Sequence, residues 1–506
     1  MLPHSIIRSL LSLLFFGLTV CGSGYAGKAI SIGHHRQMFI DDFLIEESEN
    51  ITRRLCPVEK HPENPVVRPD RLWEGRLAVP QGSVIYDEQE KLFKMWYTTN
   101  VQSRGKGVNF NKGKALAYAT SKDGVHWDKP EMDIVIEDDR KTNQVIAPME
   151  FGYMYQPYFV FKDLMEKNPQ RRYKMAFLSI QRNVNDPNVA NHDNTRRGSG
   201  VAFSADGLHW NKVKDFASDE LIDISHFMID PTREDKYVIY GRTLKVLPEI
   251  QEAWKGYDWF ESVYGGRAVI RSTSRDFINW KPAEFILGPD LQDPPSTEIY
   301  SMNVFPYEGI YLGLVQRYLC RLDKSTIDIQ LAISRDGVHF ARPFRDAFFS
   351  LGSIGTWDRF QLHNMSGPPL SQDDELRFYY GGRSSRHRPN TMTDAKAGGA
   401  IGLATLLRDR FVAVEASFDG GRLLTKPVKF EGAAIKVNAN TTFGKIEIRL
   451  LDDQGNPLKG YEASIEGIDS VEHTAPFEKT LEPLQGQSVQ IEFKIYNAQL
   501  YSFSIQ

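Results

Sequence analysis

A short string that recurs along the chain constrains its fold more than any other feature. The first copy, YATSKDGVHW, begins at Tyr118, and further copies begin at Val201, Ile270, Leu331 and, in degenerate form, Ile401. In the clearest copies a β-prone run leads into Ser-x-Asp-Gly-x-His and an aromatic residue. An Asp-Gly pair supplies the positive-φ positions of a tight hairpin turn. Each copy therefore predicts two strands joined by such a turn.

Two more β-prone runs precede each copy, such as GSVIYD from Gly82 and LFKMWYTT from Leu92. Each repeat thus offers about four short strands. A repeated four-stranded antiparallel sheet is the unit of a β-propeller, whose blades bury their faces only against one another and must close into a ring. We predict an all-β fold with a five-bladed β-propeller over residues 37–425. The turn aspartates Asp123, Asp206 and Asp336 are expected to be structural, because outer hairpins lie far from the propeller axis.

The segment 426–506 has a different character. Alternating strands surround a DDQGNP turn, and the repeated string is absent. This pattern predicts a small C-terminal β-sandwich. Helical signals are scarce throughout the chain, and Asp163 to Asn168 is the best helical candidate.

The N-terminus has the pattern of an export signal. Arg8 precedes an apolar run from Leu10 to Val20, and small residues lead to Ala26. We predict a signal peptide over residues 1–26 and a secreted or periplasmic protein. The alternative, an uncleaved membrane anchor, is disfavoured because the run is shorter than the ~20 residues that span a bilayer; after cleavage no membrane partner is expected. Cleavage would leave Cys56 and Cys320, and the sequence leaves open whether they pair.

Charge argues against one class of partner. The 506 residues carry a formal net charge of -4, with no long run of Lys or Arg. Binding to nucleic acid requires positive charge to neutralise phosphates. We therefore predict no nucleic-acid partner.

The axial funnel is the one place in a propeller where side chains of all repeats converge. Carboxylates dominate the residues expected there, and the catalytic candidates are Glu298, Asp358, Asp223 and Glu74. Two carboxyl groups facing each other across a partly dry funnel have their pKa values pushed apart, which leaves one as acid and the other as base or nucleophile. This is the apparatus of glycoside hydrolysis. Glu298 is the predicted acid, and the other three compete for the opposing role; each could instead be a loop cap or a solvated turn residue.

Aromatic, basic and imidazole side chains near the same strands are the candidates for substrate binding. They are Trp73, Arg76, His226, Tyr300, Arg317, His363 and Arg383. Trp73 is either a stacking platform for a sugar or a core residue. The two histidines lack ligands at metal-binding spacing, so we predict no metal and no cofactor. Arg242, Arg317 and Arg383 end equivalent strands, where they form either an anion-binding cluster or ties between blades.

The repeats, the string NPVVRPDRLWEG before the first blade and the ending NAQLYSFSI resemble the five-bladed β-propeller glycoside hydrolases typified by families 32, 43, 68 and 130. Invertase-type WMNDPNG, RDP and EC elements are missing, so no single family is assigned and no catalytic residue is carried over from the resemblance. The resemblance implies a carbohydrate substrate. We predict a secreted glycoside hydrolase that cleaves a poly- or oligosaccharide. The alternatives are a carbohydrate-binding propeller without catalysis and a sialidase-like enzyme, the latter disfavoured by five repeats rather than six.

Overall fold

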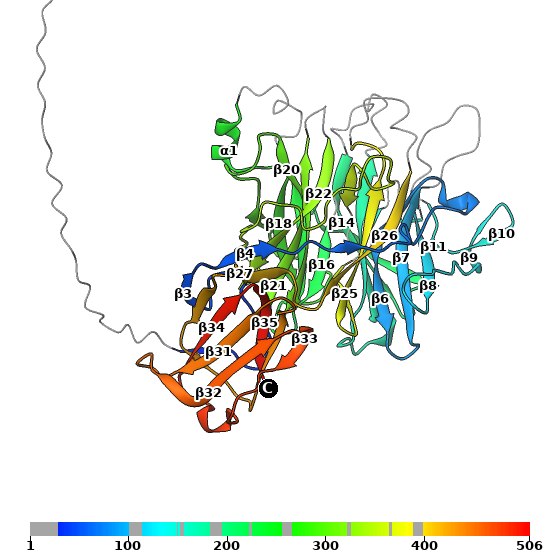
Figure 1. Ribbon diagram of the computed structural model, residues 1–506. Coiled ribbons are helices and arrows are strands. Elements are labelled where there is room, and N and C mark those ends of the chain that lie inside the picture. The colour runs from blue at the N-terminus through cyan, green and yellow to red at the C-terminus, as the bar shows by residue number, and fades with distance from the viewer. Residues whose placement is uncertain are drawn as a thin grey trace, which may run out of the picture.

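The computed structural model describes residues 29–100, 114–148, 150–151, 156–182, 195–221, 225–255, 266–320, 325–363, 367–387 and 398–506. Over these residues the chain is nearly all β, with one short α-helix, α1 (Pro248–Ala253) (Figure 1). Residues 163–168, the best helical candidate in the sequence, do not form a helix: Asp163 accepts the backbone N–H of Met165 in a turn between two strands. The predicted signal peptide lies outside the described residues. None of the described helices has the length and apolarity needed to span a bilayer.

Three antiparallel sheets of four strands follow one another along the chain. The first sheet has the order β11 (Gln144–Ile146), β8 (Lys114–Ser121), β7 (Leu92–Asn100), β6 (Ala78–Asp87). The second sheet has the order β12 (Gln156–Lys162), β13 (Tyr173–Arg182), β14 (Thr195–Ser204), β15 (Trp210–Ser218). The third sheet has the order β16 (His226–Ile229), β17 (Tyr237–Thr243), β18 (Ala268–Ser274), β19 (Glu284–Leu287).

Two further groups of strands are joined into one eight-stranded sheet. The fourth group contains β20 (Thr297–Tyr307), β21 (Ile310–Leu319) and β22 (Thr326–Ser334). The fifth group contains β23 (Gln361–His363), β24 (Leu370–Gln372), β25 (Glu375–Arg383), β26 (Gly399–Leu407) and β5 (Glu59–Lys60). A single parallel pairing, Ile327 with Gln361, connects the groups. Strand β5 comes from the N-terminal part of the chain, which thus completes a sheet built mainly from residues 361–407.

Apolar clusters join these sheets and groups in sequence. Representative pairs within one cluster are Trp96 with Tyr173, Phe161 with Phe277, Val238 with Val304, Leu314 with Phe378, and Tyr97 with Tyr379. They connect the first sheet to the second, the second to the third, the third to the fourth group, the fourth to the fifth, and the fifth back to the first sheet. Each sheet therefore buries its two faces against its two neighbours in this succession.

The repeated string forms a hydrogen-bonded turn, as predicted, but the aspartate acts differently from the prediction. In the copies with an Asp-Gly pair only the glycine has positive φ, for example 78° at Gly124 and 80° at Gly207, and in the third copy Phe277 takes this position with φ of 68°. Asp123 Oδ1 instead accepts the backbone N–H groups of Val125 and His126, both at 2.8 Å. Asp206, Asp276 and Asp336 repeat this arrangement. These aspartates satisfy backbone donors that the tight turn leaves unpaired, which is a structural role.

The turns also contact the preceding sheet. A backbone carbonyl oxygen of each turn accepts a hydrogen bond from a side chain of that sheet. The donor–acceptor pairs are Tyr379 and Gly124 (2.7 Å), Trp96 and Gly207 (2.7 Å), Arg171 and Asp276 (3.1 Å), and Tyr240 and Gly337 (2.7 Å). In the degenerate copy the carboxylate of Asp409 accepts from the Tyr307 hydroxyl at 2.6 Å. The donors follow the same circular order as the apolar clusters.

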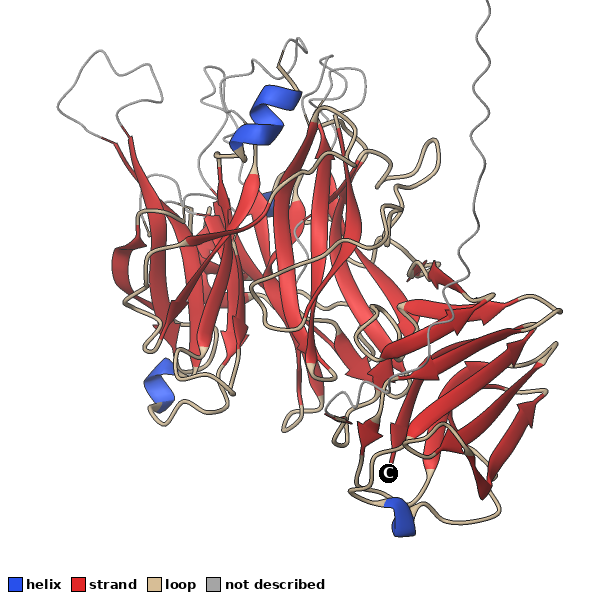
Figure 2. Ribbon diagram, turned by 90° about the vertical axis from the view of Figure 1, so that its left-hand side faces the viewer, coloured by secondary structure: helices blue, strands red, loops and turns tan. Residues whose placement is uncertain are grey.

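The C-terminal strands lie in a separate lobe at the C-terminal end of the chain (Figures 1 and 2). One sheet has the order β33 (Asp469–Thr474), β30 (Ile435–Asn440), β35 (Ala498–Ile505), β27 (Val412–Ala416), β4 (Thr52–Leu55), with β2 (Gln37–Met38) also on β35. The other has the order β3 (Ile45–Glu49), β28 (Gly421–Thr425), β34 (Gln490–Tyr496), β31 (Lys445–Leu451), β32 (Pro457–Glu466). The short pairs β1 (Ile30–Ser31) with β29 (Val428–Lys429) and β9 (Met132–Glu137) with β10 (Arg140–Thr142) complete the strands.

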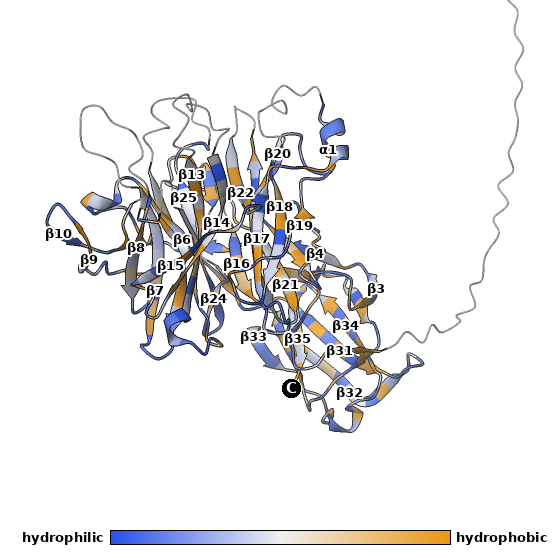
Figure 3. Ribbon diagram, turned by 180° about the vertical axis from the view of Figure 1, so that it is seen from behind, coloured by the Kyte–Doolittle hydropathy of each residue, from blue (hydrophilic) through white to orange (hydrophobic). Residues whose placement is uncertain are grey.

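The two sheets of this lobe share one apolar cluster, to which Val437 and Phe503 contribute from one sheet and Ile448 and Phe493 from the other. Alternation of apolar and polar residues along β31 and β34 is visible in Figure 3. Strands from both sides of residue 426 belong to these sheets, and so do strands from residues 37–55. The sequence-based division at residue 426 stays a prediction. Cys56 and Cys320 are both free thiols.

Candidate functional site

The first strands of the successive sheets converge on a cavity of about 330 Å³. Its lining comes from β6, β12, β16, β20 and the residues around the start of β24. Apolar side chains such as Val84, Phe159, Phe227 and Phe305 dominate this lining. Lys162 is the charged residue of the lining, and it is ion-paired with Asp87 at 2.9 Å. The described lining residues of this cavity include no carboxylate.

Strand β20 changes from apolar to polar toward its start. Phe305 lines the apolar cavity, whereas Asn303 Nδ2 donates to the Gly367 carbonyl at 2.7 Å. Ser301 Oγ lies 3.4 Å from His226 Nε2, and Glu298 stands at the second position of the strand. The pairing with β21 is irregular between Ile299 and Ser301, so Tyr300 is an extra, bulged residue. Such bulges re-aim a side chain and are common beside functional sites.

Glu298, the predicted acid, is buried and ion-paired. Its Oε2 binds Nη1 of Arg267, which precedes β18, and the two side chains are 6 % and 10 % exposed. Burial alone would lower the pKa of Arg267, but the charge of Glu298 and their hydrogen bond outweigh it and raise that pKa. A carboxylate in this pair is a hydrogen-bond acceptor.

Tyr300 lies among basic side chains. The guanidinium carbon of Arg242 is 4.0 Å from the ring centroid of Tyr300, and Arg242 Nε donates to the Tyr300 carbonyl at 2.9 Å. Arg267 is 5.5 Å from the same ring, and His387 Nε2 is 2.9 Å from the Tyr300 hydroxyl. We call Arg242, Arg267, Glu298, Tyr300, Arg383 and His387 the Tyr300 cluster.

Arg383 adds a further positive charge to the Tyr300 cluster. Burial lowers the pKa of Arg383, and the nearby Tyr300 partly offsets this effect. In the described part of the chain, Arg383 Nε has no hydrogen-bond partner. The cluster thus holds three arginines against one carboxylate, Glu298. This arrangement is suited to binding electron-rich oxygen atoms.

His226 occupies the interior between β16, β20 and β21. It is 2 % exposed, and its Nε2 lies 3.4 Å from Ser301 Oγ and 3.5 Å from Gln316 Nε2. Burial lowers the pKa of His226 to about 3. The imidazole is therefore neutral near pH 7, in agreement with a hydrogen-bonding role. Across the described ranges no cluster of three His, Cys, Asp or Glu side chains could hold a metal ion.

The first-sheet candidates belong to a separate, fully bonded network. Glu74 is completely buried and accepts hydrogen bonds from the Tyr97 hydroxyl at 2.5 Å and Lys129 Nζ at 2.9 Å. Trp73 is buried, and its Nε1 donates to Asn143 Oδ1 at 2.7 Å. These contacts fit the reading of Trp73 as a core residue. Arg76 follows them on the surface.

The remaining predicted residues are dispersed. Asp358 Oδ2 accepts from Lys60 Nζ at 2.6 Å and from the Tyr380 hydroxyl at 3.1 Å. Arg317 forms a two-point ion pair with Asp328, at 2.9 and 2.6 Å. Asp328 lies on the adjacent strand β22, so this pair is within the fourth group and does not tie two blades together.

His363 is buried on β23, and Asp223 lies outside the described residues. The structure thus brings Glu298, Tyr300 and Arg383 together, with His226 nearby, and leaves Glu74 and Asp358 with basic partners of their own. Catalytic roles for these carboxylates stay predictions.

Sequence reasoning missed three residues of this region: Arg267, His387 and Gln316. Arg267 lies three residues before the repeat copy that begins at Ile270, and His387 follows the strand that ends in Arg383. The only feature of the sequence that could have indicated these residues is a polar side chain next to the end of a predicted strand. That signal is shared by dozens of other positions, so it did not distinguish them.

The solved structures to which this chain is similar include glycoside hydrolases of families 43 and 130, and they single out no one family. Similar structures include a β-1,2-mannobiose phosphorylase from Listeria innocua in complex with β-1,2-mannobiose, at 10% identity and a TM-score of 0.45, covering 69% of this chain and 96% of that one.

Two further similar structures have other activities in their names. An N-acetylgalactosamine deacetylase from F. plautii in complex with blood group B trisaccharide is 16% identical at a TM-score of 0.43, covering 71% of this chain and 96% of that one. A thermostable family-43 glycoside hydrolase is 12% identical at a TM-score of 0.43, covering 67% and 94%. No family model matches the sequence. No curated protein matches it either.

Proposed function

We propose that this chain is an exported glycoside hydrolase built on a five-bladed β-propeller, with a β-sandwich formed by the C-terminal lobe. The circular order of the apolar clusters and of the turn-to-sheet hydrogen bonds supports a closed ring of five blades. The apolar segment 10–20 supports export through a signal peptide over residues 1–26.

One observation carries the enzymatic proposal. A buried carboxylate, Glu298, stands at the start of an axial strand beside a half-buried tyrosine and three arginines. In the proposed reaction the arginines and Tyr300 hold sugar oxygens, and Glu298 acts on the glycosidic bond. Hydrolysis of a glycosidic bond uses a carboxyl group as acid, base or nucleophile, and the carboxyl group of Glu298 is proposed for this role.

The test is the release of new reducing ends from a panel of neutral and acidic polysaccharides. On a cleaved substrate, Glu298→Gln should reduce kcat by about 100-fold or more while the protein stays folded. Glu284→Gln is the matched control, because Glu284 is also ion-paired with an arginine, Arg271, but lies half-exposed on β19. Equal rates for Glu298→Gln and the wild type would remove Glu298 from the mechanism.

A second candidate function is carbohydrate binding without catalysis. It is favoured by the contacts of Glu74 and Asp358, whose carboxylates are both held by lysines. Calorimetric binding of a glycan without release of reducing ends, with or without added phosphate, would favour this candidate over the hydrolase.

A further inference from the structure

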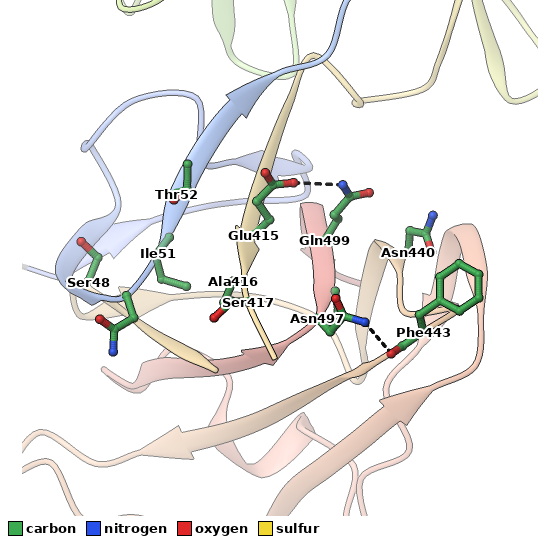
Figure 4. Close-up of a pocket in the computed structure, with 12 residues that line it drawn as sticks. Ser48, Ile51, Thr52, Glu415, Ala416, Ser417, Asn440, Phe443, Asn497 and Gln499 are labelled. Atoms are coloured by element: carbon green, nitrogen blue, oxygen red, sulfur yellow. Dashed lines mark hydrogen bonds between the residues drawn. The ribbon is translucent and has the colours of Figure 1, made fainter. Parts of the chain in front are cut away.

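The C-terminal lobe contains a cavity of about 720 Å³, whose lining includes no residue of the Tyr300 cluster (Figure 4). Its walls come from the β3–β4 connection, the end of β27, and the residues that flank β30 and begin β35. Four carboxamide side chains line it: Asn50, Asn440, Asn497 and Gln499. Hydroxyl groups of Ser48, Thr52 and Ser417 add to the lining. This cavity presents many neutral donors and acceptors on one surface.

An exposed aromatic ring borders these amides. Phe443 is 84% exposed, and Figure 4 shows its ring beside Asn440 at one side of the cavity. Exposure of a whole phenyl ring to water is unfavourable by about 25 cal/mol per Å² of apolar surface. Phe418, 83% exposed, follows the lining residue Ser417 in the neighbouring loop. A flat apolar surface next to polar groups is the pattern of a ligand site.

Hydrogen bonds hold the two loops in place. The backbone N–H of Asn497 donates to the Ser417 carbonyl at 3.0 Å, and Asn497 Nδ2 donates to the Phe443 carbonyl at 2.8 Å. Asn497 therefore fixes the loop that carries Phe418 and the loop that carries Phe443. The ring of Phe443 is presented from an anchored backbone, which reduces the entropy lost when a ligand binds.

The one negatively charged side chain in the described lining of this cavity is paired with an arginine. Glu415 is the charged residue of its described lining, and it accepts from Arg54 Nε at 3.0 Å and from Gln499 Nε2 at 2.9 Å. With its carboxylate neutralised by Arg54, the cavity favours neither an anion nor a cation. Its ligand should be neutral, rich in hydroxyl groups, and apolar on one face.

We propose that this cavity is a binding site for a neutral oligosaccharide or for a segment of a neutral polysaccharide chain. The C–H face of a sugar ring packs on Phe443. Its hydroxyl groups bind the hydroxyls of the opposite wall and the remaining hydrogen-bonding capacity of two carboxamides. These are Asn440, whose Oδ1 already accepts from the Thr442 N–H, and Gln499, whose Nε2 already donates to Glu415. The site is separate from the proposed active site and does not depend on catalysis at Glu298.

The experiment is affinity electrophoresis of the full chain in gels that contain xylan, arabinan, galactomannan, mixed-linkage β-glucan or polygalacturonate. We expect at least one neutral polysaccharide to retard the protein. Phe443→Ala and Asn440→Ala should each weaken that retardation by about tenfold in apparent Kd, which corresponds to 1.4 kcal/mol. Phe285→Ala, which removes a partly exposed ring from β19, is the matched control and should bind as the wild type does.

Glu298→Gln separates this proposal from the proposed active site. Retention of binding in Glu298→Gln together with its loss in Phe443→Ala supports the cavity. Binding by Phe443→Ala and Asn440→Ala that equals wild-type binding would overturn it, as would retardation by polygalacturonate alone. Thermal unfolding of each variant shows whether a loss of binding reflects a loss of fold.

Discussion

The indole of Trp96 in the first sheet donates from Nε1 to the carbonyl oxygen of Gly207 in the second sheet, at 2.7 Å. Both groups are buried, and the contact joins a sheet interior to the turn of the next repeat. The same relationship recurs between Tyr379 and Gly124 and between Tyr240 and Gly337. The repeated string therefore specifies contacts between sheets as well as turns within them.

Substitution of the turn glycine should reveal this contact. Gly207 has φ of 80°, and a Cβ there would come within 2.6 Å of the Trp96 ring. We expect Gly207→Ala to lower the free energy of unfolding by about 3 kcal/mol, from backbone strain and overpacking together. Gly455→Ala is the control: its φ is 82° but no atom lies within 4 Å, so only about 1 kcal/mol should be lost. Equal losses in urea denaturation would contradict the role of the contact.

The ion pair of Glu298 should contribute to stability through burial. Arg267→Met leaves a carboxylate that is 6 % exposed without its partner, at an expected loss of about 3 kcal/mol. Arg271→Met breaks the pair with Glu284, whose side chain is 51 % exposed, and should change stability by less than about 1 kcal/mol. Urea unfolding of both variants tests the difference, and a similar loss in the two would mean that Glu298 is solvated.

His226 should make stability depend on pH. Its pKa is about 3 in the folded protein because of burial, against an ordinary value of 6.5. The neutral imidazole is fully accommodated above pH 6.5, and the unfolded state takes up the proton first as pH falls from 6.5 toward 3. Relative to His226→Gln, the wild type should lose about 1.4 kcal/mol per pH unit in this window. Parallel unfolding energies of the two proteins from pH 7.5 to 5.5 would contradict this assignment.

Substitution of Asp358 tests whether this residue has a structural or a catalytic role. Its carboxylate is held by Lys60 and Tyr380, so Asp358→Asn should lower the free energy of unfolding by about 1–3 kcal/mol. With Asp358 so engaged, we expect kcat to change by less than about threefold. A loss of kcat by about 100-fold in a folded Asp358→Asn protein would instead make Asp358 the carboxylate that opposes Glu298.

The strands of the repeats were predictable because their signal is local. Alternation and the Ser-x-Asp-Gly turn depend on neighbours in sequence, and the turns at Asp123, Asp206 and Asp336 form as expected. The sequence did not reveal that the aspartate accepts two backbone N–H groups. Asp and Gly are both common at positive φ, so an Asp-Gly pair suggests that both residues adopt it. The use of residues 37–55 in the C-terminal sheets was also missed, because pairing across the whole chain leaves no local pattern.

The candidate site was predictable only in part. Glu298 and Tyr300 were found because a polar residue at the start of an apolar strand is unusual. Their partners Arg267 and His387 come from other strands, and the choice of partner depends on packing rather than on spacing in the sequence. The same limit explains why Glu74 and Asp358 were candidates for the carboxylate opposing Glu298, since their partners Lys129 and Lys60 are distant in the sequence.

The pairing of Lys60 in β5 with Ala404 in β26 has a consequence for biosynthesis. A ribosome makes β5 long before it makes β26, so the nascent chain holds an unmatched edge through most of translation. The fifth group cannot be completed until β26, which ends at Leu407 of the 506 residues, has emerged. Its completion is therefore a late step of synthesis, and a truncated product that ends before β26 would lack the partner that β5 requires.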